Sequence, residues 1–241
     1  MKFLVCNTYE EASQEAAKIF EEQLRAKPSS VLGLATGSTP LGLYRELIRA
    51  YQLGGLDFSA VTTINLDEYY PIAPTHEQSY RYFMNENLFK HINVAPAKTF
   101  VPDGQAASPE DESVSYDERI KRLGGIDLQL LGIGENGHIG FNEPSDALRM
   151  DTHVEVLTES TRKANARFFS SIDEVPTHAI TMGMAGIMTA KKILLLACGK
   201  NKHEVVKAMQ DKTVTTQIPA TLLKCHPDMT LICDRAAFEG R

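Results

Sequence analysis

Short apolar runs alternate along this chain with longer stretches in which apolar residues recur every three or four positions. The short runs are typical of strands buried on both faces, and the longer period is that of helices with one buried side. The runs lie at residues 3–6, 31–35, 61–66, 128–133, 193–198 and 229–233, and the helical stretches at 10–26, 41–51, 79–89, from about 110, and 202–209. This alternation predicts an α/β fold, Rossmann-like, with a mostly parallel sheet covered by helices on both faces.

Sheets of this kind bind ligands at the carboxyl ends of their strands. Three loops with unusual sequences follow such strand ends, at Thr36, at Asp67 and at Gly132. We therefore expect residues about a hundred positions apart to meet in one crevice. The segment 142–157 leaves the third loop without clear periodicity, and we expect it to act as a lid over that crevice.

Length and charge limit the possible classes of protein. The chain has 241 residues, which is enough for one α/β domain with a full core, so we expect a single domain over residues 1–241. The net charge of −6, with Lys and Arg scattered, argues against nucleic acid as a partner.

The cysteines and the N-terminus indicate where the protein works. The four cysteines show no C-x-x-C spacing and lie mostly in or beside apolar runs, which is typical of thiols in a reducing compartment. After Lys2 only four apolar residues precede polar ones, and no later stretch is long enough to cross a membrane. We expect a cytoplasmic protein with no membrane partner.

The loop after the run 128–133 carries the strongest chemical signal. It reads GIGENGHIGFNEP (132–144), so that glycines, which allow tight turns and close approach of a ligand, surround His138 and precede Glu143. Histidine is the side chain suited to exchanging protons with a substrate oxygen at neutral pH, and Glu143 can orient the imidazole of His138. Taken singly, a structural histidine and a surface acid are the commoner fates of such residues.

The same loop contains the spacing G-x-G-x-x-G, which is the dinucleotide fingerprint. A true fingerprint opens directly into a helix that receives the pyrophosphate. Here Gly140 and Pro144 follow at once and no helical period begins. We therefore expect no nicotinamide cofactor.

A second loop, ATGSTP (35–40), joins a buried run to a helical stretch. Free backbone N–H groups at Gly37, Ser38 and Thr39 would form an anion site that the helix dipole favours. Thr39 is placed to cap the helix and Pro40 suits its first position. From this segment alone, a phosphate site and a simple helix cap are equally favoured.

Two adjacent carboxylates, Asp67 and Glu68, follow the run 61–66. Side chains alternate along an extended chain, so only one of them can face the crevice. A partly desolvated carboxylate at a strand end can remove a proton next to a carbonyl. The simpler alternative is a pair of solvated acids that open a turn before Pro71.

Two cations are candidates for binding an anion. Lys202 begins a helix, where the dipole disfavours a cation unless an anion is bound there, and Arg167 lies in a polar segment with aromatic residues. Both can also be ordinary solvated charges. His203 and Glu204 lack the second histidine of H-E-x-x-H, and no histidine pair has zinc spacing, so we expect no catalytic metal.

Taken in order, these segments resemble the glucosamine-6-phosphate deaminase family over nearly the whole chain. The matching segments are LATGSTP (34–40), NLDEY (65–69), GIGENGHIGFNEP (132–144), TR (161–162) with ANARF (164–168), and LLLACG (194–199) with Lys202. The resemblance implies a sugar-phosphate isomerase type of fold and an aldose–ketose isomerase/hydrolase of amino-sugar metabolism. Its reaction would convert glucosamine 6-phosphate to fructose 6-phosphate and ammonia without a cofactor.

The resemblance also implies a role for each residue. His138 would open the sugar ring, with Glu143 and Asn136 beside it, and Asp67 would move the C2 proton to C1. The phosphate of the substrate would bind to the following residues: Gly37, Ser38, Thr39, Arg167 and Lys202.

Three departures from the family pattern bear on these roles. Asn136 stands where many relatives have Asp, so Glu143 gains importance as the charged partner of His138. In the phosphate loop, Ser38 replaces a common glycine. Regulated members bind N-acetylglucosamine 6-phosphate through basic residues whose places His153 and Glu155 occupy here, and the chain ends early. We therefore expect a monomer or a homo-oligomer rather than an allosteric hexamer.

Two other functions remain as alternatives. The hydrolase 6-phosphogluconolactonase has a similar fold but typically shows Asp-Glu-Arg where Tyr69 follows the acids here, and it lacks the ending FNEP (141–144). A non-catalytic sugar-phosphate sensor would have lost the acid–base residues and would carry a DNA-binding segment. The sequence disfavours both.

Overall fold

The core of the structure is a seven-stranded parallel sheet, seen in a computed structural model that describes residues 1–159, 162, 169 and 171–241. Its strand order is β1-β10-β9-β6-β2-β3-β5, and every neighbouring pair is parallel. The strands are β1 (Lys2–Cys6), β2 (Val31–Leu34), β3 (Thr62–Asn65), β5 (Thr99–Phe100), β6 (Leu128–Leu131), β9 (Ile193–Ala197) and β10 (Met229–Asp234). The predicted α/β fold is confirmed.

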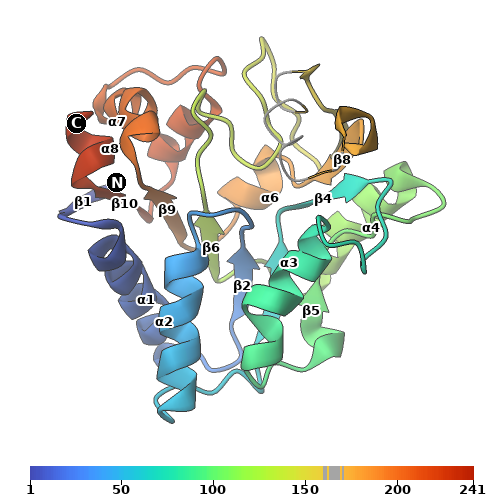
Figure 1. Cartoon of the computed structure of the whole chain (residues 1–241), viewed down its shortest axis with the longest axis horizontal. Coiled ribbons are helices and arrows are strands. Elements are labelled where there is room, and N and C mark those ends of the chain that lie inside the picture. The colour runs from blue at the N-terminus through green and yellow to red at the C-terminus, as the bar shows by residue number, and fades with distance from the viewer. Residues whose placement is uncertain (160–161, 163–168, 170) are drawn as a thin grey trace.

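Helices cover both faces of this sheet. In Figure 1, α1, α2 and α3 lie in front of it, and α4 and α6 lie behind. The α-helices with assigned bounds are α1 (Tyr9–Ala26), α2 (Leu41–Gln52), α3 (Tyr80–Asn87), α4 (Pro109–Arg122), α6 (Met184–Met188), α7 (His203–Gln210) and α8 (Arg235–Glu239). Short 3-10 helices occupy Phe89–His91, Pro96–Lys98, Ile172–Glu174, Lys200–Lys202 and Pro219–Cys225.

Local sequence explains where several helices begin. The side chains of Thr8, Ser79 and Ser108 each accept a backbone N–H bond in the first turn of α1, α3 and α4. The helix α1 then buries a stripe that includes Ala12, Ala16 and Phe20, at the spacing of one helical face. The helical period of the sequence therefore reports the packing correctly.

A second, three-stranded antiparallel sheet was not predicted. It consists of β4 (Asp67–Tyr70), β8 (His178–Thr181) and β7 (His153–Val156), in the order β4-β8-β7. Figure 1 shows β4 and β8 in the upper right part of the molecule, above the level at which the arrow of β2 ends. This sheet thus stands beside the carboxyl ends of the main strands.

The order of the main strands defines the crevice. The neighbours β6, β2 and β3 are followed by the loops that start at residues 132, 35 and 66. From β2 the chain proceeds to β3 and β5 on one side, and then returns to β6 on the other side. A ligand site at such a reversal of strand order is the rule for open α/β sheets.

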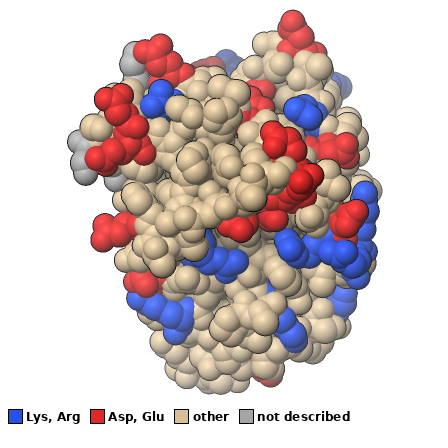
Figure 2. Space-filling model, turned by 90° about the vertical axis from the view of Figure 1, so that its right-hand side faces the viewer, with Lys and Arg blue, Asp and Glu red and all other residues tan. Residues whose placement is uncertain are grey.

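Charges of both signs share the face that contains α4. This helix has acidic residues in its first turn and basic residues in its last turn. Figure 2 shows acidic side chains mostly in the upper half of this face and basic ones mostly below them.

Among the described residues, no helix is long and apolar enough to cross a membrane.

Candidate active site

The loop after β6 folds back on itself so that His138 lies over Gly134. The amide of Gly134 donates to the carbonyl of His138 at 3.0 Å, and a Cβ at Gly134 would lie only 2.4 Å from the imidazole. Gly137 has a φ of +87°, a conformation that a side chain would strain. The glycines of this loop are therefore required for the position of the histidine.

His138, Glu143 and Asn136 form one cluster within this loop. Nδ1 of His138 lies 3.5 Å from Oε1 of Glu143, and the two side chains are 32% and 14% exposed. The Asn136 amide donates to Oε2 of Glu143 at 2.7 Å, while its carbonyl oxygen accepts the backbone N–H of His138 at 3.1 Å. Asn136 thus orients the carboxylate, and Glu143 is close enough to stabilise a protonated imidazole.

Asp67 lies against the same loop, at the first position of β4. A Cβ on Gly140 would lie 3.3 Å from Oδ2 of Asp67 and 2.9 Å from the hydroxyl oxygen of Thr181, the residue paired with Asp67 in β8. Asp67 is only 6% exposed. Burial, together with the charge of Glu68, raises the pKa of Asp67 to about 8. This carboxylate is therefore a stronger base than an ordinary one.

Glu68 points away from Asp67, as the alternation along a strand requires. It is 1% exposed and accepts the backbone N–H groups of Tyr69, Tyr80 and Arg81 at 2.9, 2.8 and 2.9 Å. The alternative of two solvated acids opening a turn is thus wrong, because both carboxylates are buried in a strand.

The loop between β2 and α2 supplies backbone groups at the same edge of the sheet. Gly37 has a φ of +91°, and α2 begins at Leu41 with Pro40 at the N-cap position. The prediction that Thr39 caps this helix is wrong, since no side chain caps α2. The hydroxyl of Tyr9 accepts the Gly42 amide at 2.6 Å instead.

Tyr9 also holds the other side of this loop. Its hydroxyl lies 3.0 Å from the carbonyl oxygen of Thr39 and 3.2 Å from that of Ser38. Tyr9 does not stand out in the sequence, because no local pattern pairs the first turn of α1 with a loop about thirty residues later.

Lys202 lies in the loop after β9 and interacts with Glu135 of the glycine loop. It occupies the N-cap position of α7 in the short segment Lys200–Lys202. Burial lowers its pKa, and the charge of Glu135 in the glycine loop opposes that effect. Asn201 beside it donates to Glu135 at 2.7 Å, so the two loops are joined directly.

The structure brings most of the predicted site residues to one edge of the sheet. Arg167, which was expected to bind phosphate, lies outside the described residues. Among the residues that the structure describes, no group of three His, Cys, Asp or Glu side chains is arranged to hold a metal ion.

Comparisons with known proteins agree with this geometry. The model of the family "Glucosamine-6-phosphate isomerases/6-phosphogluconolactonase" matches residues 7–232. A glucosamine-6-phosphate deaminase of Clostridium perfringens is 59% identical over 237 residues, covering 98% of each chain. One of Halothermothrix orenii is 54% identical over the same length, with 98% of each chain covered.

Solved structures show the same relationship. A structure described as a monomeric glucosamine-6-phosphate deaminase superimposes with a TM-score of 0.96 at 47% identity and covers all of both chains. The 6-phosphogluconolactonase of Trypanosoma cruzi has a TM-score of 0.77 at 20% identity, covering 99% of this chain and 96% of its own, which shows a shared fold. The chain therefore belongs to the family of glucosamine-6-phosphate isomerases and 6-phosphogluconolactonases.

Proposed function

We propose that the site converts glucosamine 6-phosphate to fructose 6-phosphate and ammonia. The observation that carries this proposal is a buried, basic Asp67 that lies against the glycine loop holding the His138–Glu143 pair. A base for a carbon acid and a separate proton donor are what an aldose–ketose conversion needs. Relatives named for this deamination at up to 59% identity support the same substrate.

Ring opening is the first step that we assign. His138 moves a proton from the anomeric hydroxyl to the ring oxygen, so that the C1–O bond of the ring breaks and an aldehyde forms. Glu143 lies 3.5 Å from Nδ1 and stabilises the imidazole while it carries the extra proton. Asn136, bonded to Glu143 at 2.7 Å, keeps that carboxylate in place.

Proton transfer along the carbon chain follows. Asp67 removes the C2 proton of the open-chain sugar while a proton of the substrate's ammonium group moves to the aldehyde oxygen, which gives an enolamine between C1 and C2. The protonated Asp67 then returns its proton to C1. The resulting imine at C2 adds water and releases ammonia, which leaves a ketone at C2. The hydrolytic part of the reaction is confined to this last step, and the rest is an isomerisation.

The phosphate group anchors the substrate at a distance from the reacting carbons. We assign it to the backbone of Gly37, Ser38 and Thr39, to Lys202, and to Arg167, which lies outside the described residues. Lys202 at the amino end of α7 supports this, because bound phosphate would offset the unfavourable helix dipole. Binding at a remote group holds a flexible sugar in register for proton transfer.

We also propose one cytoplasmic catalytic domain over residues 1–241 that works without an allosteric hexamer. The four cysteines are free, which supports a reducing compartment. His153 is buried, and its Nε2 lies 3.3 Å from Oε2 of Glu155. These two side chains therefore interact with each other, and neither is offered to an effector. A protein similar over its whole length is described as monomeric.

The test is a comparison of two substrates with the purified protein and no added metal. With glucosamine 6-phosphate we expect ammonia and fructose 6-phosphate in equal amounts. With 6-phosphogluconolactone we expect no hydrolysis above the spontaneous rate. Hydrolysis of the lactone by a protein that releases no ammonia would leave the fold intact and replace the proposed function with that of a lactonase.

A further inference from the structure

Glu68 is buried at the junction between β4 and α3. Its two carboxylate oxygens accept N–H groups of Tyr69 in its own strand and of Tyr80 and Arg81 in the first turn of α3. The amides of Tyr80 and Arg81 belong to the unpaired donors that begin every helix, and a carboxylate there also meets the positive end of the helix dipole. Glu68 therefore anchors the amino end of α3 to the strand that carries Asp67.

The anchored end of α3 in turn supports the glycine loop. The ring of Tyr80 stacks on that of Phe141, with 6.2 Å between centroids and 7° between planes, and lies 4.9 Å from the ring of Tyr69. Phe141 belongs to the loop that holds His138 and Glu143, and its amide donates to Thr181 at 3.1 Å. A shift of α3 would thus disturb the loop as well as the strand.

The charge of Glu68 also acts on Asp67. The ionisable groups that interact with Asp67 are Glu68 and Tyr69 on β4, Tyr80 on α3 and Tyr116 on α4, and the loop of His138 touches it through Gly140. Burial raises the pKa of Glu68, while its three amide bonds and the Arg81 guanidinium lower it. The net result is a pKa of about 7. For Asp67, the part of the chain that the structure describes offers no such compensation, and the negative charge of Glu68 makes its ionisation harder still.

We propose that Glu68 is a positioning residue for the deamination, which fixes α3 to β4 and holds a buried negative charge next to Asp67. This inference rests on the proposed function, since Asp67 is taken as the C2 base. Glu68 itself touches neither the substrate nor the reacting atoms in this account.

The direct test is Glu68→Gln, which keeps the shape of the side chain and removes its charge. We expect kcat to fall by about tenfold or more with KM changed less than about threefold, because the base is weakened while the phosphate site is untouched. The acid limb of kcat/KM should move to lower pH by about one unit. Glu77→Gln removes an exposed carboxylate near the same helix and should leave the limb in place.

Ser79→Ala distinguishes a purely structural role at this end of α3 from an electrostatic effect on Asp67. Ser79 accepts the Tyr82 amide at 3.0 Å and caps the same end of α3 without a charge. This variant should lower the melting temperature without moving the acid limb. If Glu68→Gln loses activity but its limb stays with that of the wild type, the proposal is overturned.

Two further measurements cover the remaining cases: Glu68→Asp serves if Glu68→Gln fails to fold, and an NMR titration of Asp67 serves if the substrate is wrong. Glu68→Asp keeps the charge, so its acid limb should stay near that of the wild type while kcat falls; a limb displaced downward by about a unit would contradict the electrostatic role. The carboxyl carbon of Asp67, assigned by its loss in Asp67→Asn, can be titrated by NMR without substrate. Its pKa should be higher in the wild type than in Glu68→Gln, and equal values would reject the inference whatever the enzyme converts.

Discussion

Asp67 is a carboxylate that its surroundings make difficult to ionise. Burial and the neighbouring charge of Glu68 raise its pKa to about 8. Only the ionised form can take the C2 proton, so the active fraction of free enzyme grows as the pH rises. We expect kcat/KM for glucosamine 6-phosphate to rise with pH, with the midpoint of the rise near pH 8. A pH profile of initial rates measures this.

The same property makes Asp67 costly for the fold. Its folded pKa lies above its unfolded value, so the folded state binds the proton more tightly and loses stability as the pH rises from about 4 to about 8. Asp67→Asn should therefore raise the free energy of unfolding by about 2 kcal/mol or more at about pH 8, with a smaller gain at about pH 5. Denaturant titrations at the two pH values check this. A variant less stable than the wild type at both would contradict the burial of a charge.

The residues to which we assign the reaction could be identified from the sequence, because each is an unusual side chain in an unusual loop. Asp67, His138 and Glu143 stood out in this way, and the structure places them around Gly140 and Gly134. The residues that hold these loops in place could not be identified from the sequence. Glu68 and Tyr9 bind backbone amides that lie 12 and 33 residues away in the sequence, and no local pattern records such contacts.

At the scale of elements, the loop before α2 depends on a side chain from α1. The Tyr9 hydroxyl accepts from the Gly42 amide and lies within hydrogen-bond distance of the Ser38 and Thr39 carbonyls. Tyr9→Phe would remove the acceptor of the Gly42 amide and the hydroxyl beside the Ser38 and Thr39 carbonyls, and so loosen the segment to which we assign the phosphate. We expect KM to rise about fivefold to tenfold with kcat nearly unchanged, as a hydrogen bond of about 1 kcal/mol implies.

Tyr70→Phe is the matched control for this change. Its hydroxyl also donates to a backbone carbonyl, that of Ala106 at 3.0 Å, outside the loop after β2. The control should keep KM within about twofold of the wild type. Equal KM values for Tyr9→Phe and the control would show that Tyr9 does not organise the phosphate site.

The main sheet was predictable and the second sheet was not, for a physical reason. The runs at residues 31–35 and 193–198 are apolar because both faces of β2 and β9 are buried. In contrast, β4 is Asp-Glu-Tyr-Tyr and follows β3 after one residue, so its composition resembles a turn. The polar residues of β4 are buried because they form part of the candidate site. Local sequence rules are expected to fail at such sites.

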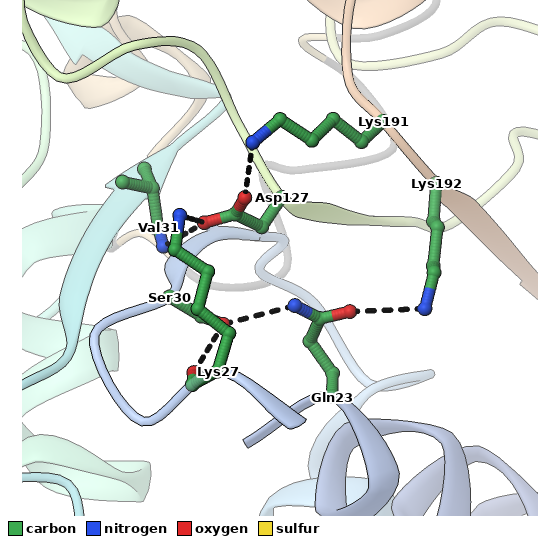
Figure 3. Close-up of polar contacts among 7 residues, drawn as sticks. All are labelled: Gln23, Lys27, Ser30, Val31, Asp127, Lys191 and Lys192. Carbon is green, nitrogen blue, oxygen red and sulfur yellow. Dashed lines mark hydrogen bonds and ion pairs between the residues drawn. The ribbon is translucent and has the colours of Figure 1, made fainter. Parts of the chain in front are cut away.

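At the scale of the whole molecule, a polar network joins the amino ends of the central strands, away from the crevice. Asp127 accepts the Val31 amide at 2.8 Å and the ammonium groups of Lys27 and Lys191 at 2.7 Å each (Figure 3). Gln23 continues the network by donating to Ser30 and accepting from Lys192. The end of α1 is thereby tied to the first residues of β2, β6 and β9.

Removing the charge at the centre of this network should weaken the fold without changing the chemistry. Burial raises the pKa of Asp127, but Lys191, Lys27 and the Val31 amide more than offset this and lower it. Its stabilising effect is therefore present above the unfolded pKa and is lost as the pH falls through the lower, folded value. Asp127→Asn should reduce the free energy of unfolding by roughly 1–3 kcal/mol at neutral pH and leave kcat unchanged.

Denaturant unfolding and initial rates on the same preparations check both halves of this prediction. Glu118→Gln is the control, because its pair with Arg122 is exposed and spans 3.7 Å. That variant should lose less than about 0.5 kcal/mol. An Asp127→Asn protein as stable as the control would mean that the network does not hold the strands together.

The central claim is that Asp67 removes the C2 proton of the sugar, and glucosamine 6-phosphate deuterated at C2 tests it most directly. The wild type should remove this deuterium as ammonia and fructose 6-phosphate form. Asp67→Asn, folded and at least as stable, should leave the deuterium on the substrate and release no ammonia. If the variant removed the C2 deuterium at the rate of the wild type, another group would be the base and the account of this site would be wrong.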